Sequence, residues 1–309
     1  FEAATIAQWA RAEGVALPRP QADLFRFAGL ADFLGFLDLA CGLASTPRRL
    51  EALAYGLCQR LADNGTGYAD VIVNPTHWHA WHGRLGAMLA AMDAGFTAAE
   101  QDGLPGVGLC VSLLRTQSAD AAAELVDTLC ALRHPRVVAL SVDGNEATAG
   151  RTGPRFADAF RRAANHGLRR TVHAGESSGP EGVWDAGNLL GADRIDHGVR
   201  AIEDAALVAM LADRQIPLGI CPTSNLVLGV YPSLPEHPID RLRQAGVRVC
   251  VNTDDPALLG ASLVGEYALC RQTFGWTDAI TRSVAHTSID ASFASAEVKA
   301  QLLAALKDW

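Results

Sequence analysis

The chain has 309 residues, of which 49% are hydrophobic, and its formal net charge is −8. This length allows one large domain or two ordinary ones, and the apolar content is ample for a packed core. The negative charge argues against nucleic-acid binding, which depends on neutralising phosphates.

The seven cysteines and the apolar runs indicate the compartment. No two cysteines form a C-x-x-C pair, and most of them lie within apolar segments. We expect buried, reduced thiols, which are typical of a reducing compartment. No apolar run is long enough to span a bilayer, and no cleavable signal segment is visible. We therefore expect a cytoplasmic protein without a membrane partner, although a start at Phe1 rather than Met is also compatible with processing.

The pattern of apolar residues predicts three helices followed by alternating strands and helices. The first helices are expected over Ala4–Glu13, Phe25–Leu39 and Pro47–Ala62. Short β-like runs then alternate with longer helix-like runs, which is typical of βα units around a parallel sheet. The predicted strands are Tyr68–Asn74, Val107–Ser112, Val137–Val142, Arg170–His173, Arg194–His197, Pro217–Cys221 and Val247–Asn252. The predicted helices between them are Leu85–Gln101, Ala119–Leu132, Arg155–Ala164, Asp204–Arg214 and Ile239–Gln244, and the chain from Ser262 onward is expected to be helical.

Seven predicted strands are one short of a closed eight-stranded barrel. Because the chain opens with a helix, we expect the missing first strand to lie upstream of Phe1. There is no low-complexity stretch, fixed repeat or convincing linker, so residues 1–309 are predicted to form a single domain. The predicted class is α/β, with a (β/α)₈ TIM barrel whose active site is built from the carboxyl ends of its strands.

Two histidines follow apolar runs at such strand ends. His173 ends one predicted strand, and Glu176 follows three residues later. Imidazole is a common Zn²⁺ ligand, and a nearby carboxyl group can transfer protons. His197 ends the next strand and is followed by Gly198, as expected for a tight exit. In isolation each histidine also fits a structural role, but their succession favours a site.

Two adjacent carboxylates, Asp254 and Asp255, follow a third apolar run, and Pro256 is expected to stop that strand. Carboxylates beside a buried strand are costly unless a metal or a hydrogen-bonded ligand compensates them. The alternative is a turn, since Asp-Asp-Pro has good turn chemistry.

Three further segments each allow more than one interpretation. His77 and His79 form an H-x-H pair in a loop, with metal ligation, pocket lining and a solvated loop as alternatives. The segment Cys221–Asn225 either caps a loop entry or supports the site. Gly144 follows a strand, where it would let the backbone approach a ligand or simply make a turn.

Together these motifs resemble the adenosine deaminase family of the amidohydrolase superfamily. The similarity runs from Phe1 to about Lys299, and both the order and the spacing of the motifs fit. The matching segments are His173-Ala-Gly-Glu176, Arg194-Ile-Asp-His197-Gly, Cys221-Pro-Thr-Ser-Asn225, Glu236-His-Pro238, Asn252-Thr-Asp-Asp-Pro256 and Ala291-Ser-Phe293.

The resemblance implies a (β/α)₈ barrel with one catalytic Zn²⁺. By motif, His173 and Asp254 would be metal ligands, and Glu176 would protonate the purine ring nitrogen beside the reacting carbon. His197 would orient the hydroxide nucleophile and help to remove its proton. The implied reaction is hydrolytic deamination of a 6-aminopurine.

The resemblance also implies two substrate contacts. Asp255 would hold the hydroxide or the imidazole nitrogen of the purine, and Gly144 would offer its backbone N–H to the purine. The family's H-x-H pair of zinc ligands would fall upstream of Phe1, and His77 and His79 do not occupy its position.

The motifs disagree on the substrate. Arg194–His197 and Leu226–Val230 look closer to the adenine deaminase branch, whereas Asn252–Asp254 and Glu236–Pro238 look closer to the nucleoside branch. We predict adenosine or a related nucleoside, with adenine or aminodeoxyfutalosine as the alternative. A non-catalytic purine-binding relative without metal is the alternative of another class. The expected partner is a small purine, and a homo-oligomer is compatible with the sequence.

Overall fold

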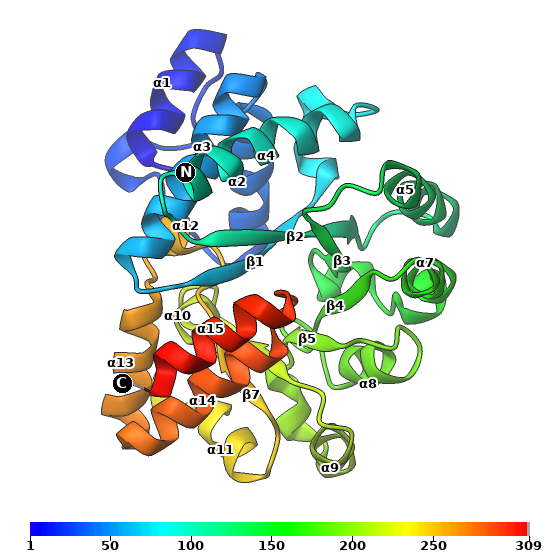
Figure 1. Cartoon of the computed structure of the whole chain (residues 1–309), viewed down its shortest axis with the longest axis vertical. Coiled ribbons are helices and arrows are strands. Elements are labelled where there is room, and N and C mark those ends of the chain that lie inside the picture. Colours follow the sequence, from blue (N-terminus) through cyan, green and yellow to red (C-terminus); the bar gives the residue numbers. More distant parts are fainter. Residues whose placement is uncertain (308–309) are drawn as a thin grey trace.

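Seven parallel strands form one curled sheet in the computed structural model, which describes residues 1–307. The order of strands in the sheet follows their order in the sequence, and helices cover its outer face (Figure 1). Such an arrangement results when every strand is followed by a crossover to the next parallel strand. The strands are β1 Tyr68–Val73, β2 Gly106–Leu114, β3 Val137–Asp143, β4 Arg169–Ala174, β5 Arg194–His197, β6 Leu218–Ile220 and β7 Val249–Val251.

The barrel-like fold and all seven strands predicted from the sequence are confirmed. Strands β6 and β7 are shorter than predicted, with three residues each. Among the described residues, β1 and β7 form the two edges of the sheet. The strand expected upstream of Phe1 stays a prediction, as does the single domain.

Helices fill the connections. Their bounds are α1 Ala3–Glu13, α2 Leu30–Gly42, α3 Pro47–Asp63, α4 Leu85–Gln101, α5 Ala119–Leu132, α6 Glu146–Ala149, α7 Gly153–Asn165, α8 Glu181–Asn188, α9 Ala205–Asp213, α10 Pro222–Val227, α11 Ile239–Gln244, α12 Pro256–Leu259, α13 Leu263–Phe274, α14 Asp278–Ala291 and α15 Ala296–Lys307. Short 3₁₀ helices lie at η1 Gln21–Asp23, η2 Pro75–His77, η3 His79–Trp81, η4 Val199–Glu203 and η5 Leu234–Glu236.

The second helix begins five residues later than predicted. Gly29 has a φ of 116°, which an L side chain rarely adopts, and α2 starts directly after it. The Asp32 side chain accepts the Ala28 N–H at 2.9 Å and closes this entry. The ring of Phe27 packs against Phe33 instead of continuing the helix. The aromatic residues that suggested a longer helix therefore belong to the loop that precedes it.

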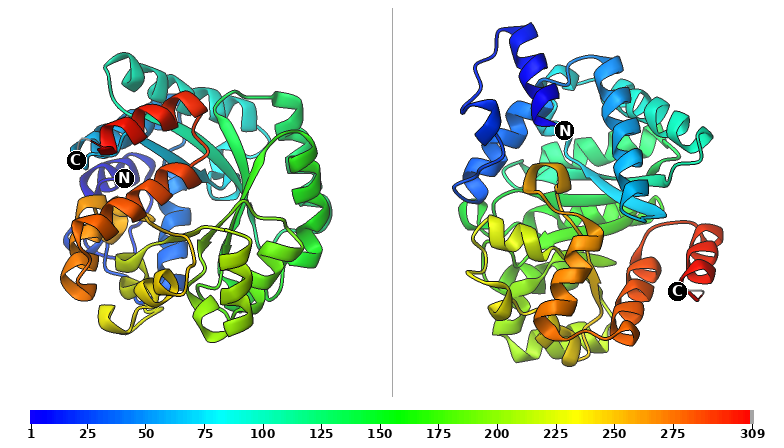
Figure 2. Two further views of the ribbon diagram at one scale, coloured as in Figure 1. Left: turned by 60° about the horizontal axis from the view of Figure 1, so that its bottom comes forward. Right: turned by 90° about the vertical axis from the view of Figure 1, so that its left-hand side faces the viewer.

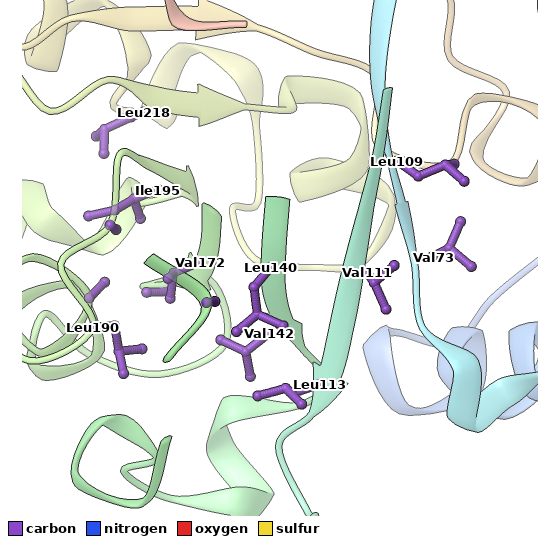
Figure 3. Close-up of a cluster of buried hydrophobic side chains, with 14 of the residues drawn as sticks. Val73, Leu109, Val111, Leu113, Leu140, Val142, Val172, Leu190, Ile195 and Leu218 are labelled. Atoms are coloured by element: carbon purple, nitrogen blue, oxygen red, sulfur yellow. The ribbon is translucent and has the colours of Figure 1, made fainter. Parts of the chain in front are cut away.

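The hydrophobic core lies between the sheet and the helices. Figure 3 shows this cluster, with side chains from six of the strands and from the segment after α8. Both Phe156 and Phe160 of α7 are fully buried, one helical turn apart. Full burial of one such side chain contributes about 1.5–3 kcal/mol. Strands β2, β3, β6 and β7 are nearly continuous apolar runs because both of their faces are covered, whereas β4 and β5 carry several charged side chains.

A polar cluster ties the first strand to the C-terminal helices. The Arg194 guanidinium contacts the Asp70 carboxylate at 2.7 Å and lies 4.4 Å from the Phe293 ring centroid. The Phe293 N–H also donates to Asp70, at 3.0 Å. Phe293 lies between α14 and α15; Figures 1 and 2 show α15 near β1, while α14 packs beside β7. Asp70, Arg194 and Phe293, which lie far apart in the sequence, are thus in contact in the folded protein.

The seven cysteines are free thiols, and six of them are buried, as predicted. Within residues 1–307, every helix is too short or too polar to cross a membrane.

Candidate functional site

The sheet brings the predicted site residues to one place. His173 is the fifth residue of β4 and His197 is the last of β5, and the register of these strands sets Ala174 beside His197. The two imidazole rings are consequently 5.1 Å apart between centroids. Asp254 follows β7 and reaches the same point, so that ligand atoms of these two histidines and Asp254 lie within 4.8 Å of one another.

Two of these residues have a strained backbone. His197 has a φ of 65° and Asp254 a φ of 58°, in the left-handed region that non-glycine residues seldom occupy. Such conformations cost on the order of 1–3 kcal/mol each and cluster at functional sites. The other two non-glycine residues with positive φ, Arg133 and Gln215, lie just after helices, where this conformation ends a helix.

The donor set fits a divalent metal ion. Nδ1 of His173 is buried without a hydrogen bond and lies 3.5 Å from Asp196 Oδ2. A buried imidazole nitrogen without a partner is costly unless something compensates it. Imidazole nitrogens together with a carboxylate are the mixed donors that Zn²⁺ prefers.

Glu176 lies beside this group in the loop after β4. Its side chain is 8% exposed, and Oε1 is 3.7 Å from His197 Nε2. Burial raises the pKa of Glu176, and the Asp254 carboxylate raises it further, while His197 opposes them. A carboxyl group with a raised pKa can hold a proton near neutral pH and deliver it to a substrate.

The loop that carries Glu176 is held by a second buried carboxylate, which the sequence analysis did not identify. Glu146 accepts the N–H groups of Gly175, Glu176 and Ser177 at 3.0, 2.8 and 3.2 Å. Arg115 lies 3.8 Å from this carboxylate and donates to the His173 carbonyl oxygen. The sequence signal was the Asp143–Glu146 segment, in which only the glycine was singled out.

The aspartate pair lies where it was predicted, but Pro256 does not stop the strand. Strand β7 ends at Val251, and Pro256 is the first residue of α12, where its missing N–H costs nothing. Ser224 Oγ donates to Asp254 Oδ2 at 2.6 Å. Burial raises the pKa of Asp255, and the adjacent Asp254 carboxylate raises it further.

The segment Cys221–Asn225 supports the site instead of capping a loop. Helix α10 starts at Pro222, and its N-cap, Cys221, makes no side-chain cap hydrogen bond. The Ser224 side chain contacts Asp254, and Asn225 Nδ2 lies 3.3 Å from His197 Nδ1. Both side chains are fully buried.

The H-x-H pair lies apart from this group. His77 Nδ1 and His79 Nε2 lie 3.1 and 2.9 Å from the two carboxylate oxygens of Asp38 in α2. Within residues 1–307, only His173, His197 and Asp254 form a group that could hold a metal ion. His77 lines the cavity described next, so of the three alternatives pocket lining fits His77 best.

A cavity of about 1140 Å³ opens over the site. Apolar side chains of α2 and α12 line its outer part, among them Phe33, Leu37 and Leu258. Gly144 has a φ of 101° and lies on the wall. The residues with predicted roles that line this cavity are Gly144, His173, Glu176, His197, Asp254 and Asp255. The structure therefore gathers all six in one chamber.

Known proteins with similar sequences are purine deaminases. The family model described as adenosine deaminase matches residues 1–309. An adenine deaminase of Agrobacterium fabrum is 34% identical over 282 residues, which cover 91% of this chain and 86% of that protein. An aminodeoxyfutalosine deaminase of Streptomyces avermitilis is 33% identical over 289 residues, 93% of this chain and 80% of that protein.

Solved structures agree. The crystal structure of an adenine deaminase from Arthrobacter aurescens matches with a TM-score of 0.90 and 30% identity, covering all of this chain and 94% of that one. An amidohydrolase from Burkholderia ambifaria, solved with bound Zn, matches with a TM-score of 0.89 and 28% identity, over 100% of this chain and 86% of that one.

Proposed function

This chain belongs to the adenosine deaminase family and is a hydrolytic deaminase, and from that membership we propose that it converts adenine and water to the 6-oxopurine and ammonia. The similar proteins favour the free base over the nucleoside that the motifs suggested. One observation carries the proposal: His173 with Glu176, His197 and Asp254 come from three separate segments and meet at one end of the sheet, as a hydrolytic site requires.

His173 and Asp254 are the residues of this chain that would hold the metal. A Zn²⁺ ion supplies a Lewis acid and lowers the pKa of a bound water to about 7. Ser224 keeps the Asp254 carboxylate oriented through its 2.6 Å hydrogen bond. Such supporting hydrogen bonds fix the geometry of metal ligands.

The other site residues would act on the substrate. Water adds to the carbon that bears the amino group, and Glu176 gives its proton to the neighbouring ring nitrogen. The C–N bond to the amino group then breaks. Of the two protons of the water, one leaves with the ammonia and the other restores the protonated form of Glu176. Asp255 and the backbone N–H of Gly144 would hold the purine, since both line the cavity.

The test measures zinc and ammonia on the full-length protein. We expect about one equivalent of zinc and ammonia release from adenine at a higher kcat/KM than from adenosine. Turnover of adenosine in preference to adenine would contradict the substrate. Full zinc content without turnover of any purine would contradict the activity.

Aminodeoxyfutalosine is the second candidate substrate. It carries the same reacting 6-aminopurine, and one of the similar proteins is named an aminodeoxyfutalosine deaminase. The same ammonia assay with this compound compares the two candidates directly.

A further inference from the structure

The His197 ring belongs to a chain of three buried hydrogen bonds that leads away from the cavity. Its Nδ1 lies 3.3 Å from Asn225 Nδ2, and Asn225 Oδ1 lies 3.0 Å from His237 Nε2. The chain ends at the backbone of Ile239, whose N–H points at His237 Nδ1 over 3.3 Å. The three side chains are at most 2% exposed, so no solvent competes with these bonds.

The backbone end of the chain sets its direction. Ile239 is the first residue of α11, and the first N–H groups of a helix have no acceptor within the helix. A backbone N–H only donates, so His237 Nδ1 must accept. Burial lowers the pKa of His237 to about 4, and the positive charge of Arg241 adds to the effect. The ring is therefore neutral at pH 7 and carries its one proton on Nε2.

Each later bond follows from this one. His237 Nε2–H donates to Asn225 Oδ1, and the Asn225 amide group then donates from Nδ2 to His197 Nδ1. A reversed amide would need a proton on His237 Nδ1, directly opposite the N–H of Ile239. Two donors facing each other in a buried site are strongly unfavourable.

We propose that Asn225 and His237 are positioning residues that hold His197 with its proton on Nε2. This inference rests on the proposed deaminase function and deepens it. Nε2 faces the carboxylates of Glu176, at 3.7 Å, and Asp254, at 4.0 Å. His197 thus presents an N–H donor to the oxygen that attacks the substrate.

The proposal separates His197 from the other members of the metal-binding group. A nitrogen that carries a proton has no lone pair for a metal ion, so His173 and Asp254 remain as the ligands from this chain. The sequence analysis expected His197 to help to remove the proton of the attacking water. The proposal replaces that expectation, because Nε2–H cannot accept this proton. His197 then stabilises and orients that oxygen by donation.

Nitrogen NMR of the metal-loaded, full-length protein with ¹⁵N-labelled histidine tests the tautomer. The signals of His197 are assigned by comparison with a His197→Asn variant. We expect Nδ1 to have the chemical shift of an unprotonated imidazole nitrogen and Nε2 that of a protonated one. A proton on Nδ1 in the wild-type protein would overturn the proposal, and this measurement needs no variant of Asn225 to fold.

An Asn225→Asp variant tests the consequence. Its carboxylate accepts from both histidines, so the His197 proton should move to Nδ1, and kcat should fall by about 10²–10⁴-fold with little change in KM. His237→Gln retains an N–H towards Asn225, and it should leave His197 Nδ1 unprotonated. Asn188→Asp, on exposed α8, adds the same charge far from the site and is the matched control.

The outcomes are distinguishable. A proton transfer to Nδ1 in Asn225→Asp without loss of kcat would overturn the role assigned to the tautomer. If the wild-type protein deaminates no purine, the proposed function fails, while the NMR result still decides whether Asn225 and His237 set the tautomer.

Discussion

At the residue scale, Glu176 should separate catalysis from metal binding. We expect Glu176→Gln to lower kcat by about 10²–10⁴-fold, because the amide has no proton to give to the ring nitrogen. Zinc content should stay at the wild-type level, since the proposed metal ligands are His173 and Asp254. Ammonia release and metal analysis of the same preparation check both statements.

The control for this change is Glu181→Gln, an exposed position on the nearby helix α8. It removes the same charge without touching the site and should retain wild-type turnover. Equal activity of the two variants would exclude Glu176 as the proton donor.

His237 should make the stability of the protein depend on pH. Its pKa falls from 6.5 to about 4 on folding, so the unfolded chain binds more protons between these values. The contribution is fully present above pH 6.5 and is lost as the pH falls towards 4, by about 3 kcal/mol in total. Urea unfolding at pH 7.5 and pH 5 should show a smaller loss for His237→Gln than for the wild-type protein. Parallel losses in the two proteins would contradict the prediction.

At this scale, a residue could be predicted when its neighbours in the sequence indicated its role. His173, Glu176, His197, Asp254 and Asp255 were predicted because each stands at the end of a predicted strand or a few residues after it. By contrast, the supporting role of Glu146 could not be predicted from the sequence, because its hydrogen-bond partners lie 29 to 31 residues away. Only the fold brings α6 under the loop after β4.

At the element scale, α6 holds the loop that carries Glu176 through the hydrogen bonds of Glu146. Glu146→Gln leaves one acceptor oxygen and places an NH₂ group against at least one of the three backbone donors, which are divided between the two carboxylate oxygens. We expect kcat to fall by about 10²-fold through a displaced Glu176, with a smaller change in KM. Stability should fall by about 1–3 kcal/mol, because a buried N–H loses its partner. Steady-state kinetics and urea unfolding measure the two effects.

Glu124→Gln on the exposed face of α5 is the matched control for Glu146→Gln. If Glu146→Gln lost stability without losing kcat, the carboxylate would support the fold but not the position of Glu176.

Elements were predictable when they were long or apolar throughout. Strands β2, β3, β6 and β7 were predictable because both of their faces are buried, which makes each one a nearly continuous apolar run. Helices α6 and α12 have four residues each, too few to show a helical period. The start of α2 was misplaced because aromatic side chains of a loop imitate an apolar helix face.

At the scale of the whole molecule, Arg194 joins distant parts of the chain. We expect Arg194→Met to destabilise the protein by about 3–5 kcal/mol, because it leaves the buried carboxylates of Asp70 and Asp196 without their cation. Urea unfolding measures this cost. The control is Arg169→Met on β4, whose side chain is 58% exposed and paired with Asp193, and which should cost at most about 1 kcal/mol. Equal costs for the two variants would contradict the assigned role of the cluster.

This cluster was not predictable from the sequence. Arg194 was noted only as part of a motif, and its partner Asp70 lies 124 residues away. The barrel class itself was predictable, because the alternation of strands and helices is a property of neighbouring segments. Contacts across the interior depend on closure of the sheet, which no local pattern encodes.

The hydrogen bond from Phe293 to Asp70 has a consequence for synthesis on the ribosome, because it spans 223 residues. At translation rates of about 5–20 residues per second, roughly 10 to 45 s pass between the emergence of the two partners. Arg194 can pair with Asp70 earlier, but until Phe293 emerges the edge strand β1 lacks this contact with the C-terminal segment, and exposed edges invite pairing with other chains. We therefore expect the nascent chain to depend on chaperones until Phe293 has left the exit tunnel.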